Sequence, residues 1–113
     1  MYPLKLHASL TGEKWEAYST TKQVLMIANE LNRAVNCIKN NYPEDAGRCF
    51  ERAMELTDLT VEDIRWRRSL KELLRFRELL SELYISKNID LNRMCLSGLL
   101  SFDAGAWNML AVR

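Results

Sequence analysis

Residues 61–86 read VEDIRWRRSLKELLRFRELLSELYIS and contain neither glycine nor proline. Large apolar side chains return every three or four positions, which is the spacing of one face of an α-helix. The pattern predicts one long helix over 61–86, with Thr60 as its N-terminal cap. Leu74 and Leu79 widen the apolar face, so we expect this helix to contact neighbours on two sides. The main residues of that face are Trp66, Leu70, Leu73, Phe76, Leu80, Leu83 and Tyr84.

Two further helices are predicted upstream of this stretch. The first begins at Ser19-Thr20-Thr21, whose hydroxyl groups can accept hydrogen bonds from the free amides of a first turn. It ends before Pro43, which suits the first turn of the next helix because its missing amide costs nothing there. The connection is so short that the two helices must run antiparallel. On the first helix, Glu30 falls outside the apolar stripe, which predicts a solvent-facing side chain.

The predicted fold class is all-α, as an antiparallel four-helix-type bundle, because no alternating strand pattern competes with the helical spacing. A fourth helix follows, with Asp90 as its cap. At 113 residues the chain suits one domain. We divide it into an N-terminal arm (1–18) docked through Trp15 and Tyr18, the helical bundle (19–100), and a C-terminal tail (101–113). The tail is apolar enough to dock on the bundle or on a second subunit.

The amino-acid composition limits which partners and which cellular compartment we expect for the protein. The chain carries 16 basic and 15 acidic residues, for a net charge of +1, whereas proteins that neutralise many phosphates are usually far more basic. Its three cysteines form no CxxC pair, which favours reduced thiols in a cytoplasm over disulfides. No apolar run approaches the roughly 20 residues of a membrane span. We therefore expect a cytoplasmic protein with no membrane partner.

Catalytic and metal-binding patterns are missing from the sequence. His7, in the arm, is the only histidine, so a nucleophile–histidine pair would need it delivered to a distant side chain. Metal sites in helical bundles typically combine glutamates with Glu-x-x-His pairs, which need more than one histidine. No glycine-rich phosphate loop is present. We predict no enzyme activity, no catalytic residue, no cofactor and no metal.

The most unusual composition lies in residues 65–77, which hold six of the sixteen basic residues. Arg67, Arg68, Lys71 and Arg75 form a stripe that could contact nucleic-acid phosphates or a protein partner. The competing interpretation is a solvated surface in which Arg68 pairs with Glu72 and Arg75 pairs with Glu78 at helical spacing. The sequence favours the solvated surface and leaves the other two open.

Arg77 falls inside the predicted apolar face of the same helix. A buried guanidinium without a partner is costly, so Arg77 needs a carboxylate nearby or must extend to the rim of the core. Asp58, or a glutamate of a neighbouring helix, could supply the carboxylate. We predict a structural ion pair between Arg77 and Asp58.

Four runs carry a resemblance over roughly residues 20–100: ELNRA at 30–34, FERAMELTDLT at 50–60, DIRWR at 63–67 and LKELLR at 70–75. Together they resemble a family of small bacterial all-helical proteins to which no function is assigned. The resemblance implies a microbial cytosolic protein and supplies no activity.

Two other helical families share single features with the chain. Ala46, Phe50 and Ala53 match the second-helix spacing of a tetratricopeptide repeat, but no second copy follows at the roughly 34-residue period of that repeat. Small helical bundles of the HEPN type pair with nucleotidyltransferases or cut RNA through an R-x4-6-H motif. No histidine follows an arginine here, which disfavours the nuclease and leaves a non-catalytic relative open.

These patterns favour a non-catalytic helical bundle that acts through protein–protein interaction. We expect a homodimer formed through the third helix and the C-terminal tail, together with an unknown protein partner. The alternative is a nucleic-acid-binding module, or a HEPN-like accessory protein, that uses the basic stripe.

Overall fold

The computed structural model describes residues 10–102, which fold into helices joined by short connections and contain no strand. The all-α prediction is confirmed. The described residues hold five α-helices and one 3-10 helix, where the sequence predicted four helices. They are α1 (Gly12–Glu16), α2 (Thr20–Lys39), α3 (Pro43–Val61), η1 (Ile64–Ser69), α4 (Leu70–Ser86) and α5 (Ile89–Leu100).

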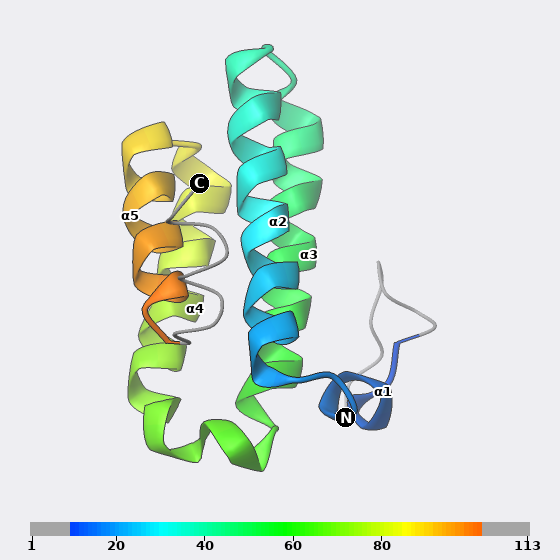
Figure 1. Ribbon diagram of the computed structural model, residues 1–113. Coiled ribbons are helices and arrows are strands. Elements are labelled where there is room, and N and C mark those ends of the chain that lie inside the picture. Colours follow the sequence, from blue (N-terminus) through cyan, green and yellow to red (C-terminus); the bar gives the residue numbers. More distant parts are fainter. Residues whose placement is uncertain (1–9, 103–113) are drawn as a thin grey trace.

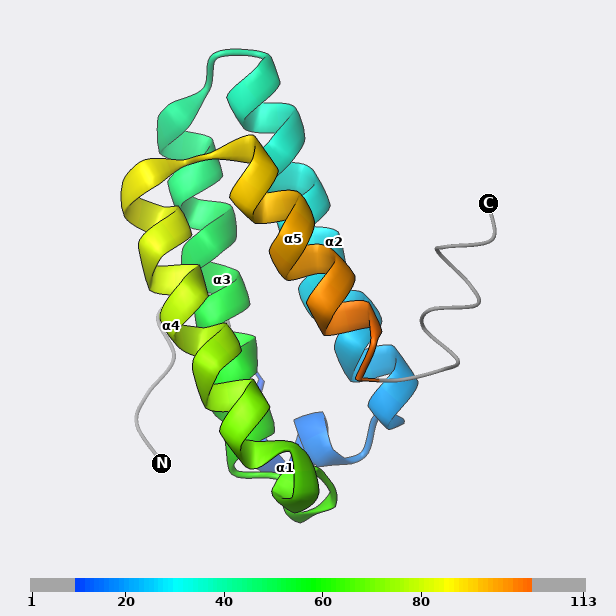
Figure 2. The ribbon, with the colours of Figure 1, turned by 90° about the vertical axis from the view of Figure 1, so that its left-hand side faces the viewer.

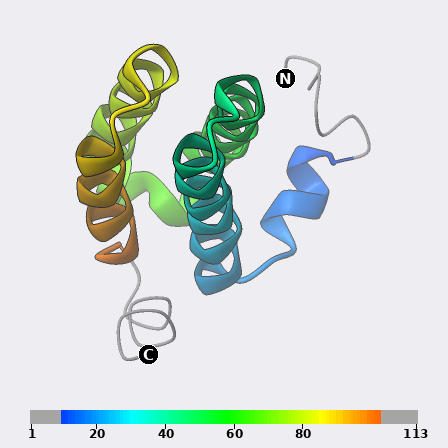
Figure 3. The same ribbon diagram turned by 90° about the horizontal axis from the view of Figure 1, so that it is seen from above.

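The four long helices are arranged in two layers, and consecutive helices run in opposite directions (Figure 1). One layer is α2 with α3, and the other is α4 with α5 (Figure 3). After a 90° turn, α4 crosses in front of α3 and α5 in front of α2 (Figure 2). Each long helix therefore contacts two others, while α1 lies beyond the α2–α3 layer, away from α4 and α5.

Both ends of α2 and the start of α3 lie where the sequence predicts them. Ser19 caps α2, and its hydroxyl accepts a hydrogen bond from the Lys22 amide at 3.1 Å. The reversal that follows places Asn41 in the left-handed region, with φ of 63°. Pro43 then occupies the first turn of α3. Local chemistry thus fixes the α2–α3 hairpin before any long-range contact is considered.

The predicted helix over 61–86 is wrong at its start. Helix α3 continues to Val61, η1 follows from Ile64, and α4 begins only at Leu70. Thr60 is buried inside α3, where its hydroxyl donates to the Leu56 carbonyl at 2.8 Å, so it caps nothing. The cap of η1 is Asp63, whose carboxylate accepts from the Arg65 amide at 3.0 Å. A carboxylate that bonds a nearby backbone amide competes with the helical ladder and interrupts it.

Two other predicted boundaries also need correction. Asn88, rather than Asp90, caps α5, because its side-chain oxygen accepts from the Leu91 amide at 3.1 Å. The arm predicted over 1–18 includes the short helix α1. Of the predicted tail, Phe102 packs edge-on against the Trp66 ring with centroids 6.0 Å apart. The remainder of the tail, 103–113, and residues 1–9 of the arm lie outside the described residues.

Small side chains let α2 and α3 approach closely. Ala28 and Ala34 on α2 and Ala46 and Ala53 on α3 are all fully buried. Larger side chains fill the rest of the core, as expected of an interior at close-packed density. The largest of them are Trp15, Ile27, Leu31, Phe50, Leu56, Leu73, Leu80, Leu83 and Leu99.

A buried polar network closes the end of the molecule where α1, α2 and η1 meet. Gln23, which has no solvent exposure, donates to the Trp15 carbonyl at 2.9 Å and to the Asp63 carboxylate at 3.0 Å. Its side-chain oxygen accepts from the Trp66 indole at 2.7 Å. The Trp15 indole donates to the Thr60 hydroxyl at 3.0 Å. One glutamine therefore joins three elements, and its amide oxygen and nitrogen both have partners.

Asp63 is the charged member of this network and is 3% exposed. The Arg65 guanidinium donates to both carboxylate oxygens, at 3.1 and 2.7 Å, and also to the Glu16 carbonyl at 2.9 Å. Hydrogen bonds from Arg65, with a further one from Gln23, outweigh burial and lower the pKa of Asp63 from 3.8 to about 2. The folded state thus favours the ionised carboxylate.

Replacing Asp63 with asparagine should destabilise the fold by about 2 kcal/mol, because an amide cannot accept all the hydrogen bonds that Arg65 and Gln23 donate. The measurement is the free energy of unfolding in urea, and Glu62→Gln at the exposed neighbouring position is the matched control. In the unchanged chain, the contribution of the Asp63 carboxylate to the free energy of unfolding should be complete above pH 3.8 and should be lost as the pH falls towards about 2. Asp63→Asn should lack that part of the pH dependence. Equal stability of the two variants at neutral pH would contradict the role given to Asp63.

Candidate interaction surface

The basic residues singled out in the sequence lie on the outer side of η1 and α4. Arg67 and Arg68 belong to η1, Lys71 and Arg75 belong to α4, and all four are exposed. None of them forms an ion pair with any of residues 10–102. The four cations thus lie exposed on η1 and the first half of α4, without an ion-pair partner among the described residues.

The surface pairs predicted within this segment are wrong. Neither Arg68–Glu72 nor Arg75–Glu78 forms an ion pair in the described part of the chain. Arg68 lies in a 3-10 helix and Glu72 in an α-helix, so the four-residue spacing no longer places them one turn apart. The basic segment is therefore exposed to solvent, as this interpretation predicted, but it lacks the two predicted ion pairs.

Exposed apolar side chains collect on the same two elements. Within residues 10–102, five of the seven large hydrophobic residues exposed to solvent lie on η1 and α4. Ile64 is 71%, Leu74 45% and Ile85 82% exposed, and Leu70 and Tyr84 complete the set. Apolar side chains scattered singly need no explanation, but their concentration on one helix marks a candidate contact surface.

Arg77 and Asp58 lie in contact between α4 and α3. The Arg77 Nε donates to Asp58 Oδ1 at 2.9 Å, and its Nη2 donates to Oδ2 at 3.3 Å. The remaining Nη1 donates to the Ser81 hydroxyl at 3.0 Å. Both side chains are partly buried, so the pair fixes the α3–α4 packing and leaves Arg77 little freedom to bind a ligand.

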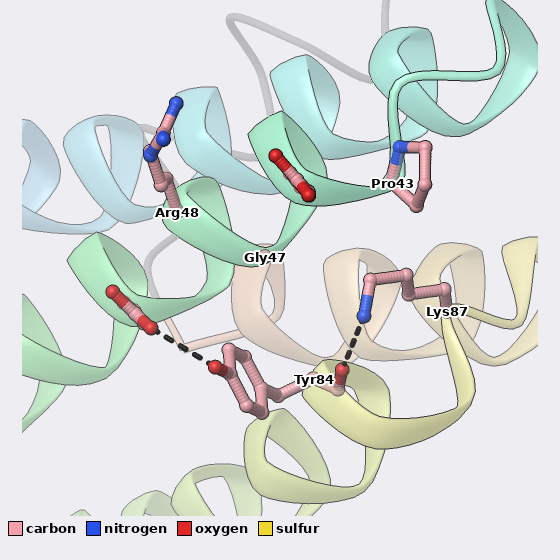
Figure 4. A pocket seen from close by; sticks show the side chains of 7 residues that line it. Pro43, Gly47, Arg48, Tyr84 and Lys87 are labelled. Carbon is pink, nitrogen blue, oxygen red and sulfur yellow. Dashed lines mark hydrogen bonds between the residues drawn. The ribbon is translucent and has the colours of Figure 1, made fainter.

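A shallow pocket of about 410 Å³ lies where the start of α3 faces the end of α4 (Figure 4). The Tyr84 hydroxyl donates to the Glu51 carboxylate at 3.0 Å, and the Lys87 ammonium donates to the Tyr84 carbonyl at 2.8 Å (Figure 4). The hydrogen bond to Glu51 raises the pKa of Tyr84. The phenol is therefore held in its protonated form.

A second hollow, between α2 and α3, is lined in part by Arg33 and Arg52, whose common partner is a buried carboxylate that sequence reasoning placed outside the apolar stripe. Glu30 is only 6% exposed. Arg52 donates to its Oε2 at 2.8 Å, and Arg33 donates to its Oε1 at 2.9 Å. The prediction of a solvent-facing Glu30 is wrong because two arginines cover the carboxylate and compensate its charge. The signal was available as the spacing of three between Glu30 and Arg33.

Two of the three thiols, Cys49 and Cys95, have a raised pKa. Arg52 donates to Cys49 Sγ at 3.2 Å, but burial outweighs this contact and raises the pKa of Cys49. Burial also raises the pKa of Cys95 to about 11. Cys37 is half-buried and lines the same hollow as the buried Cys49. A nucleophilic cysteine needs a lowered pKa, so Cys49 and Cys95 do not fit a covalent catalyst.

A third hollow separates α2 from α5 and is lined in part by Asn32 and Asn36. Asn92 at its base has no solvent exposure, and its amide nitrogen donates weakly to the Leu31 carbonyl at 3.4 Å. Its oxygen has no partner within the described residues. Asn92 lies between Leu91 and Arg93, and no feature of the sequence predicts its burial.

No group of three or more histidine, cysteine or carboxylate side chains among residues 10–102 could hold a metal ion. No helix within this range has the length and hydrophobicity to cross a membrane. His7 lies outside the described residues.

Comparison with known proteins returns no match to this chain among family models, curated proteins or solved structures. The functional proposal therefore rests on the outer face of η1 and α4, which combines exposed apolar side chains with cations that have no ion-pair partner among residues 10–102.

Burial of the thiols predicts their order of reaction. At about pH 8, Ellman's reagent should modify Cys37 of the folded protein at least about tenfold faster than Cys49 or Cys95, because only the thiolate reacts and the other two are buried. Cys37→Ser should remove the fast phase, and unfolding in guanidinium should expose the remaining thiols. Rapid modification of Cys95 in the folded protein would contradict the burial described above.

Proposed function

We propose that this chain is a non-catalytic protein-interaction module that forms a homodimer through the outer face of η1 and α4. The observation that carries the proposal is the concentration of exposed Ile64, Leu70, Leu74 and Ile85 on these two elements. Helix α4 already buries Leu73, Phe76, Leu80 and Leu83 in its own core. Its exposed apolar residues are therefore surplus to folding, and burying them against another protein would be favourable.

The rest of the molecule supplies a scaffold in this proposal. We take the four long helices to act as an antiparallel four-helix-type bundle that holds α4 rigidly at the surface. Free cysteines at three positions agree with a reducing compartment, so we place the protein in the cytoplasm. An unknown protein partner could bind the same face once the homodimer has formed or in competition with it.

A dimer should be detectable by sedimentation equilibrium at concentrations on the order of 10 μM, since a specific contact of this kind lies in the micromolar range. Leu74→Asp with Ile85→Asp should convert the dimer to a monomer without loss of helical circular dichroism. Met94→Asp on α5, at a position that is 71% exposed, is the matched control and should leave the dimer intact. A monomeric unchanged protein would refute self-association.

The second candidate function is a nucleic-acid-binding module or HEPN-like accessory protein. The observation that favours it is the exposure of Arg67, Arg68, Lys71 and Arg75 without a neutralising carboxylate among the described residues. Phosphate groups could occupy the position that an acidic side chain would otherwise take. The aromatic residues of this segment do not support base stacking, since Trp66 and Phe76 are buried at 5% and 4% exposure.

Fluorescence anisotropy with single-stranded RNA at low ionic strength tests this second candidate. If it holds, the logarithm of the affinity should fall with the logarithm of salt by about 0.7 per contacted phosphate. Arg68→Glu with Arg75→Glu should abolish binding, whereas Arg93→Glu on α5 should change it little. No binding even at low salt would exclude the nucleic-acid function.

A further inference from the structure

The charges on the outer face of α4 are ordered along the helix. Lys71 and Arg75 lie in its first half, and Glu78 and Glu82 lie in its second half. All four side chains are exposed, and with Leu74 they occupy the side of α4 opposite the buried Leu73, Phe76, Leu80 and Leu83. No ion pair within residues 10–102 involves any of the four charged groups.

This order is unfavourable for an isolated helix. Lys71 and Arg75 are like charges four residues apart, and so are Glu78 and Glu82, and each such pair destabilises a helix slightly. The one opposite pair at helical spacing, Arg75 with Glu78, forms no ion pair in the described structure. The four charges of the outer face are thus separated into a positive half and a negative half, while Glu72 lies on the flank of the helix.

The separated charges are complementary to a second copy of the same helix. Reversing α4 about a point between Phe76 and Arg77 brings Lys71 to the position of Glu82 and Arg75 to the position of Glu78. Within one helix, at about 1.5 Å per residue, Lys71 and Glu82 are about 16 Å apart along the axis, and Arg75 and Glu78 are about 4.5 Å apart. Both pairs have their midpoint between Phe76 and Arg77. A parallel copy would instead place like charges opposite each other.

The apolar residues fit the same symmetry. Leu70, Leu74 and Ile85 lie along one edge of the outer face, on the side that faces α3. In an antiparallel pair of helices, the two-fold axis lies in the plane of contact and is perpendicular to both helices. This symmetry places the apolar edge of one α4 next to the apolar edge of the other. Leu70 then lies close to the partner's Ile85, and the two Leu74 side chains lie near the axis. An apolar strip beside the ion pairs would exclude water from them and strengthen them.

We propose that two copies of this chain dock through antiparallel α4 helices, with Lys71 and Arg75 of each protomer facing the partner's Glu82 and the partner's Glu78. The inference rests on the proposed self-association and assigns its register. An isologous interface of this kind repeats each contact twice, so four ion pairs flank the apolar strip. Because charge order selects orientation more than affinity, the parallel arrangement and contacts with other basic or acidic helices are disfavoured.

The test uses two full-length variants with opposite charge reversals. Lys71→Glu with Arg75→Glu makes the whole outer face acidic, and Glu78→Lys with Glu82→Lys makes it basic. Each variant alone should self-associate at least tenfold more weakly than the unchanged chain, since its homodimer places like charges together. An equimolar mixture should recover association to within about threefold of the unchanged homodimer. Sedimentation equilibrium with one variant fluorescently labelled measures all three.

Controls separate failure of the register from failure of self-association. Asp90→Lys with Arg93→Glu, exposed on α5, should leave the homodimer unchanged. Circular dichroism must show equal helicity for every variant, and if one fails to fold, the salt dependence of the unchanged dimer replaces it. An ion-paired interface weakens as salt rises, whereas a purely apolar one does not.

Each outcome has a distinct meaning. An unchanged chain that stays monomeric refutes both the self-association and the register. If the unchanged chain dimerises and both variants dimerise equally well, the register is wrong but the self-association stands. A dimer of the unchanged chain that is insensitive to salt has the same meaning. Two monomeric variants whose mixture stays monomeric also overturn it, because antiparallel complementarity requires the mixture to associate. Heterodimer formation by the mixture supports the register.

Discussion

The carboxylate of Asp63 is the constraint on which the arrangement of the helices depends. It caps η1, accepts two hydrogen bonds from the Arg65 guanidinium, and accepts another from Gln23 on α2. These contacts hold the chain where it leaves α3 and turns towards α4. Without the interruption at this point, the helical pattern of residues 61–86 would continue from α3 as one rod and could not fold back. The two-layer arrangement follows from a single buried charge whose partners are all in place.

The network around Asp63 also explains how α1 is held. The Trp15 indole donates a hydrogen bond to the Thr60 hydroxyl, and the Trp15 carbonyl accepts one from Gln23. The Arg65 guanidinium donates to the Glu16 carbonyl. A five-residue helix has no independent stability, since helix nucleation alone is unfavourable at that length. Its position therefore depends on long-range hydrogen bonds to α2, α3 and η1. Apolar packing of Trp15 supplies stability, and the polar contacts fix the geometry.

Sequence reasoning succeeded where local chemistry decides the structure and failed where distant contacts do. Ser19 and Pro43 fix the ends of α2 and α3 through their own backbone groups, so both were predictable. The break near Asp63 depends on Gln23, forty residues earlier in the chain, and helical periodicity alone cannot reveal it. Glu30 was misplaced for a related reason, because Arg52 on another helix makes its burial possible. The four basic residues of the candidate surface were identified, but the break displaced Arg68 from the line of Lys71 and Arg75.

The same displacement changes how the surface of α4 should be understood. A continuous helix from 61 to 86 would extend the basic stripe through Arg67 and Arg68 and give a long positive track suited to a phosphate backbone. Because α4 begins only at Leu70, it has a shorter outer face, on which two positive and two negative side chains balance. A polyanion would meet repulsion from Glu78 and Glu82 along that face, whereas a reversed copy of the helix would meet attraction along its whole length. This balance of charges is the reason that we propose a protein partner rather than a nucleic acid.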